Sequence, residues 1–99
     1  MIASTILNQI GGRKFVAMTG AKDFIDLKNG LQFRLPSTRH YTRDGINSVR
    51  VILDADDTYT VEFWKVRGIN AKQVRTVDQV YADNLQHVFT TYTGLDTHL

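Results

Sequence analysis

The sequence contains no cysteine among its 99 residues, which excludes disulfide bonds, thiol nucleophiles and cysteine-ligated zinc. It has three serines, and none stands in the glycine-flanked turn that exposes a nucleophilic serine. No apolar run approaches the roughly 18 residues that a membrane span needs, and residues 1–9 lack the pattern of a signal peptide. These absences favour a cytoplasmic protein that does not contact the membrane.

The acidic and imidazole side chains do not form a recognisable metal-binding pattern. Asp54, Asp56 and Asp57 lie close together, but the glycine and the distant glutamate of a calcium-binding loop are missing. The three histidines are far apart in the sequence, and no glycine spacing matches a phosphate-binding loop. We therefore expect no catalytic residues, no metal and no cofactor, and we predict that the protein is not an enzyme.

The composition indicates one globular domain covering residues 1–99. Hydrophobic residues make up 42% of the chain and aromatic residues 10%, which is enough for a single core at this length. The net charge is only +2, but residues 1–50 hold eight Lys and Arg against three Asp, whereas residues 51–99 hold four against seven acids. This asymmetry permits an anionic partner on one side of the protein without requiring one.

The first twenty residues predict a short helix and a strand. Ser4 to Ile10 places Ile6, Leu7 and Ile10 on one side of a helix, which the following pair of glycines would end. The compact apolar run Lys14–Met18 is typical of a β-strand.

The strongest hairpin signal comes next. Asn29-Gly30 stands between Phe24–Leu27 and Leu31–Leu35, and this dipeptide favours a type I′ turn between paired strands. Pro36 would end the second strand, because proline lacks the backbone donor that a sheet needs. Residues 36–46 follow as an exposed loop.

The second half predicts another hairpin and a long helix. Ser48–Leu53 and Thr58–Val66 alternate apolar and polar residues around an acidic turn, which sets Arg50 beside Glu62. After a polar connection over residues 68–75, a capping box formed by Thr76 and Gln79 predicts a helix reaching Tyr92. The fold predicted is α+β: an antiparallel sheet of four or five strands packed against this C-terminal amphipathic helix, with a short N-terminal helix.

The candidate binding residues are basic and aromatic. Cations neutralise phosphates and aromatic rings stack on bases or anchor protein partners, so such residues suit either kind of macromolecule. The leading interpretation is a protein partner, bound through the sheet edge, the polar sheet face or the basic loop. A nucleic-acid-binding module is the alternative, and a homodimer is left open. The candidate residues are Arg39, Tyr41 and Arg43 in the loop, and Arg34, Arg50 and Trp64 on the sheet.

Several short segments are characteristic in their order along the chain: Met18–Phe24, Leu31–Pro36, Asp57–Phe63, Arg67-Gly68, Val80–Asp83 and Thr93–Leu95. In this order they resemble a family of small proteins, without an established activity, that bacteriophages and other mobile elements encode. The resemblance spans about residues 10–97 and implies an accessory protein in a bacterial cytoplasm, acting by binding a host or phage macromolecule, including as an inhibitor of a host system. The family has no known site residues to transfer.

Overall fold

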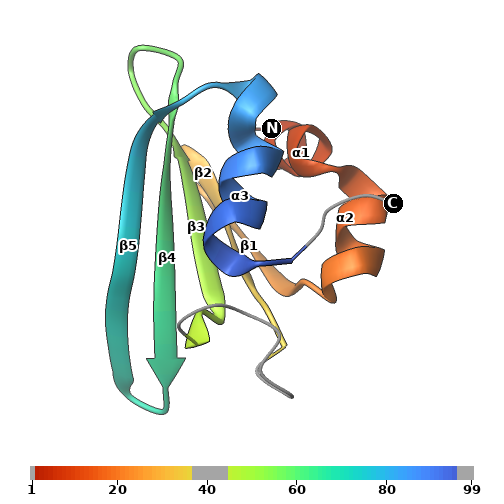
Figure 1. The fold of residues 1–99 in the computed structure, drawn as a ribbon. Helices are drawn as coiled ribbons and strands as arrows, with labels where there is room; N and C mark the ends of the chain where they lie inside the picture. The colour runs from red at the N-terminus through yellow and green to blue at the C-terminus, as the bar shows by residue number, and fades with distance from the viewer. Residues whose placement is uncertain (1, 37–44, 96–99) are drawn as a thin grey trace.

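Five stretches of the chain pair in sequence order into one antiparallel sheet (Figure 1). The computed structural model describes residues 2–36 and 45–95, and within them each strand lies beside its neighbour in the sequence. This sheet, together with its helices, confirms the predicted α+β class. The strands are β1 (Lys22–Leu27), β2 (Gly30–Arg34), β3 (Ser48–Leu53), β4 (Tyr59–Arg67) and β5 (Asn70–Val80).

The helices of the described residues lie on one side of this sheet (Figure 1). They bury the apolar face of the strands, as the alternation of apolar and polar residues in β3 and β4 requires. The predicted N-terminal and C-terminal helices are both present. The helices are α1 (Ile2–Ile10), α2 (Gly12–Thr19) and α3 (Leu85–Thr93), with the 3₁₀ turn η3 (Ala82–Asn84) just before α3.

Aromatic rings fill the centre of the core. Phe33 of β2 packs against both Phe15 of α2 and Phe89 of α3, with ring centroids 5.2 Å from the first and 6.1 Å from the second. Phe15 and Phe89 are themselves 5.2 Å apart in an edge-to-face arrangement, which aromatic quadrupoles favour. The sheet residues that face the helices are buried: Phe33, Val49, Val51, Val61 and Phe63.

The strand predicted over Lys14–Met18 is wrong, because these residues belong to helix α2. The helical period is visible in what is buried: Phe15 and Thr19, four residues apart, face the core. Thr19 Oγ1 donates a hydrogen bond to the carbonyl of Phe15 at 2.8 Å, which satisfies a buried hydroxyl inside the helix. Gly20 then ends α2 in the left-handed conformation, at φ 72°.

The predicted start of the C-terminal helix is also wrong. Residues 70–80 form strand β5, where Thr76 lies opposite Glu62, and helix α3 begins only at Leu85. The supposed capping box does not form, since Gln79 adopts φ 57° and its amide donates to Asp56 Oδ2 at 3.1 Å. The register of β5 against β4 is irregular on both sides of Val77, so Val77 and Val80 both pair with β4 although they are three residues apart. A spacing typical of a helix therefore occurs in a bulged strand.

The predicted hairpin of β1 and β2 is confirmed, but its turn differs. The two turn residues are Lys28 and Asn29, with Gly30 already paired opposite Leu27, and none of them has a positive φ as a type I′ turn requires. Gly30 is needed for another reason. A Cβ at this position would lie 2.2 Å from the carbonyl oxygen of Val51, so only glycine allows β2 and β3 to approach here.

Candidate functional site

One face of the sheet is not covered by any helix of the described residues, and we call its central part the open face. It consists of Gln32, Arg50, Glu62 and Trp64, which alternate along β2, β3 and β4 with the buried residues of the core. The register sets Arg50 directly opposite Gln32 on one side and Glu62 on the other. Strand alternation therefore brings together side chains that are up to 32 positions apart in the sequence.

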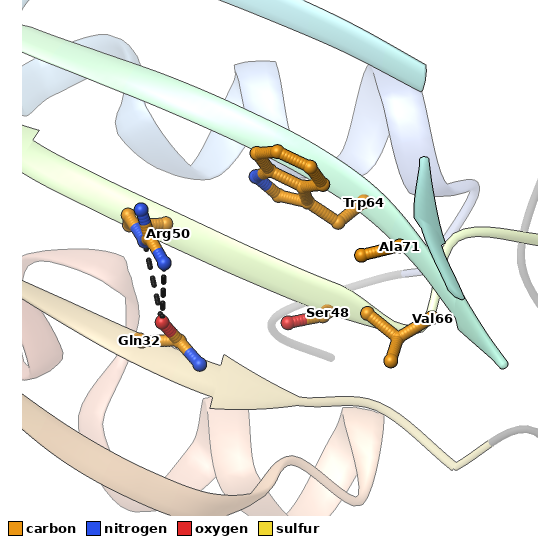
Figure 2. A pocket seen from close by; sticks show the side chains of 6 residues that line it. All are labelled: Gln32, Ser48, Arg50, Trp64, Val66 and Ala71. Atoms are coloured by element: carbon orange, nitrogen blue, oxygen red, sulfur yellow. Dashed lines mark hydrogen bonds between the residues drawn. The ribbon is translucent and has the colours of Figure 1, made fainter. Parts of the chain in front are cut away.

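A chain of polar contacts connects these four side chains. Arg50 donates from Nε and Nη2 to Gln32 Oε1, at 3.2 and 3.0 Å (Figure 2). Its Nη1 lies 3.9 Å from Glu62 Oε1, and the same carboxylate oxygen accepts a hydrogen bond from Trp64 Nε1 at 3.0 Å. The indole is thus held by a charged acceptor, and its orientation on the open face is fixed.

The predicted cross-strand pair of Arg50 and Glu62 is present, although it is long. The side chains are 41% and 22% exposed, and an ion pair this accessible contributes between about 0 and 1 kcal/mol. The pair therefore matters for the charge of the open face more than for stability. Glu62 places a negative charge at its centre, where it partly cancels Arg50.

A hollow of about 300 Å³ opens beside Trp64 (Figure 2). Its lining combines the indole and two small apolar residues with an arginine and two polar side chains. This volume is at the lower end of small-molecule sites and suits one or two side chains of a partner. The lining residues are Gln32, Ser48, Arg50, Trp64, Val66 and Ala71.

The predicted binding residues fall into two groups. Arg50 and Trp64 meet on the open face, and exposed Arg34 lies at the end of β2, opposite Ser48. Arg39, Tyr41 and Arg43 lie outside the described residues.

Four of the six residues that line the hollow were not among the candidate binding residues: Gln32, Ser48, Val66 and Ala71. Gln32 belonged to the predicted alternating strand but carried no charge or ring to mark it. Ala71 stood in a stretch taken as a polar connection, and only the pairing of β5 with β4 places it beside Val66. The polar residues of that stretch, Lys72 and Gln73 among them, conceal a strand, because both faces of β5 are largely exposed up to Gln79.

Two carboxylates of the acidic turn between β3 and β4 accept hydrogen bonds from the turn and from the adjoining strands. Asp56 Oδ1 accepts hydrogen bonds from Thr58 Oγ1 at 2.7 Å and from Thr58 N at 3.1 Å, and these bonds lower the pKa of Asp56. Asp54 Oδ2 accepts from Thr60 Oγ1 at 2.6 Å. Among residues 2–36 and 45–95, no three His, Asp or Glu side chains gather in a way that would hold a metal ion.

Outside the open face, Tyr59 contributes to the packing of the sheet against a helix. Burial raises the pKa of Tyr59, whose hydroxyl donates to Gln9 Oε1 at 2.5 Å and so joins β4 to α1.

None of the helices in the described part of the chain is long and apolar enough to cross a membrane. No protein-family model, no curated protein and no solved structure matches this chain.

Proposed function

We propose that the protein is a non-enzymatic accessory protein of a phage or mobile element that binds a host or phage protein through its open face. The observation that supports this is Trp64, a large aromatic side chain held by Glu62 beside a hollow, on a sheet face that no described helix covers. Tryptophan and arginine are the residues most enriched among the anchors of protein interfaces. A sheet whose other face packs against helices is also rigid, and this rigidity reduces the entropy lost on binding.

The charges on this face favour a protein over a nucleic acid. Arg50 already donates two hydrogen bonds to Gln32 and lies near the Glu62 carboxylate, so its charge is partly neutralised before any partner arrives. A phosphate approaching Trp64 would meet Glu62, which accepts the indole hydrogen bond. A protein partner can instead insert an apolar or amide side chain into the hollow and satisfy the polar rim.

Trp64→Ser is expected to weaken capture of the partner by about 30-fold, the loss typical of a central anchor. The measurement is affinity capture from bacterial lysate with quantitative mass spectrometry, followed by titration of the protein that the wild type retains. Tyr81→Ser is the matched control, because Tyr81 is an exposed aromatic residue outside the open face. Circular dichroism of both variants verifies that the fold is intact.

The result that supports the proposal is a protein retained by the wild type and by Tyr81→Ser but lost from Trp64→Ser. Equal retention by all three proteins would show that the open face is not the binding surface. Size-exclusion chromatography of the same variants separates a second copy of this chain from a different partner, because a homodimer would dissociate in Trp64→Ser alone.

A further inference from the structure

Strands β4 and β5 continue as a two-stranded ribbon beyond the rest of the sheet (Figure 1). Strand β3 pairs with β4 only as far as Ser48 opposite Trp64, whereas the pairing of β4 with β5 runs on to Arg67 opposite Asn70. We call this ribbon (residues 65–72), together with the adjoining residues 73–75 of β5, the β-arm. Its turn carries Ile69, a fully exposed aliphatic side chain that adds nothing to the core.

The β-arm contains every Lys and Arg of the second half of the sequence. Residues 65–75 hold four of them and no Asp or Glu, although residues 51–99 as a whole carry more acids than bases. With the described carboxylates, none of these four cations forms an ion pair. The cations are Lys65, Arg67, Lys72 and Arg75.

The register gathers these cations on one face of the ribbon. Lys65 lies directly opposite Lys72, and like charges in this position destabilise a sheet. Arg67 follows two residues after Lys65 and so shares its face. Arg75 lies opposite Phe63 with its guanidinium 5.0 Å from the centre of the Tyr92 ring, so it also projects on the helix side. The fold gains nothing from this repulsion, which a polyanion would relieve.

The opposite face of the β-arm has a different character. Val66 and Ala71 lie there, next to Trp64, and line the hollow of the open face. The β-arm is therefore amphipathic, with its charge directed away from the surface discussed under the proposed function. A partner of the cationic face would not compete with a partner of the open face.

We propose that the β-arm binds double-stranded DNA, with its cationic face against the phosphates and the ribbon in the major groove. The major groove of B-form DNA is about 12 Å wide and admits a two-stranded antiparallel ribbon. Arg67 and Asn70 lie opposite each other beside the turn, and arginine and asparagine are the side chains that recognise guanine and adenine edges there. Ile69 at the turn supplies an apolar contact for a thymine methyl group.

Other nucleic acids fit the β-arm less well. The major groove of A-form RNA is too narrow and deep for side chains to enter. Single strands bind to exposed aromatic rings, but Trp64 lies on the other face of the ribbon and Tyr92 lies beneath Arg75. The proposal concerns a surface other than the open face and stands independently of the proposed function.

The experiment is fluorescence anisotropy of a labelled 20-base-pair DNA duplex titrated with the full chain at several salt concentrations between 0.05 and 0.3 M. The test variant is Lys65→Gln/Lys72→Gln. The matched control is Arg13→Gln/Lys14→Gln, which removes the same charge from two exposed positions on α2. Each lost phosphate contact reduces by about 0.9 the slope of the logarithm of the binding constant against the logarithm of the salt concentration. If the wild type and the test variant bind equally at 1 M salt, the loss of two contacts makes the variant bind about 60-fold more weakly than the wild type at 0.1 M salt.

The expected result is this loss in Lys65→Gln/Lys72→Gln with binding by the control unchanged within a few-fold. Equal weakening of both variants would overturn the proposal, because net charge alone would then explain binding. Tighter binding of single-stranded DNA or of duplex RNA would overturn the assigned partner. Absence of duplex binding at 0.05 M salt, or equal competition by polyglutamate, would also overturn it, the latter in favour of an acidic protein.

Discussion

Phe33→Ala is expected to lower the free energy of unfolding by about 3–5 kcal/mol, the range for removal of a buried aromatic ring. Phe33 is fully buried, and its ring contacts those of Phe15, Phe24 and Phe89 at centroid distances between 5.2 and 6.1 Å. Its loss leaves a cavity where the sheet meets two helices, and it removes three aromatic contacts together. A domain of this size has only about 5–15 kcal/mol in total, so the variant should be close to unfolding.

Urea denaturation followed by circular dichroism measures this loss, and Phe24→Ala is the matched control. Phe24→Ala is the same chemical change, but the Phe24 side chain is 38% exposed. Among the aromatic rings that the structure describes, it contacts only that of Phe33. If Phe33→Ala does not fold, Phe33→Leu retains most of the volume and should lose measurably less. An equal loss in Phe33→Ala and Phe24→Ala would contradict the central position assigned to Phe33.

The second large effect is expected from substitution of Asn47, the residue just before β3. Its side chain makes hydrogen bonds to β4 in the place where a paired strand would make them. Its Nδ2 donates to the carbonyl of Val66 and its Oδ1 accepts from the amide of Val66, both at 2.8 Å. The side-chain amide therefore replaces a strand at the base of the β-arm. Asn47→Ala leaves both backbone groups of Val66 without these partners and should cost about 2–4 kcal/mol.

The control for this variant is Asn84→Ala, because Asn84 is exposed and makes no side-chain capping bond to α3. Urea denaturation gives the stability difference, and hydrogen exchange at Val66 reports the local effect. The exchange of Val66 should accelerate more than that of core amides such as Val51. A uniform acceleration throughout the sheet would contradict a local role for Asn47 at the base of the β-arm.

The β1–β2 hairpin could be predicted from the Asn29-Gly30 dipeptide, and the β3–β4 hairpin from the period-2 spacing of its apolar residues. Val49 and Val51 in β3, and Val61 and Phe63 in β4, recur at every second position and are buried, as in a half-buried strand. Strand β5 was missed for the opposite reason. Its side chains are mostly exposed on both faces, and register irregularities break the alternation, so its valines fit a helical spacing.

Of the candidate site, the sequence allowed Arg50, Trp64 and the pairing of Arg50 with Glu62 to be predicted, but not the part played by Gln32. Arg50 and Trp64 were identifiable as a cation and an aromatic ring on the polar face of neighbouring strands. That Gln32 accepts two hydrogen bonds from Arg50 depends on the register of β2 against β3. The cationic face of the β-arm was likewise hidden, because Lys65 and Lys72 face each other only once β5 is known to be a strand.

The contact between helices from opposite ends of the chain has a consequence for synthesis on the ribosome. Each hairpin of the sheet closes between neighbouring segments and can form as soon as its two strands have emerged. Phe89, however, packs against Phe15, and Gln86 Nε2 donates to the carbonyl of Gln9 at 3.4 Å. The nascent polypeptide therefore exposes an uncovered apolar surface until α3 leaves the exit tunnel, and this interval is when chaperones would bind it.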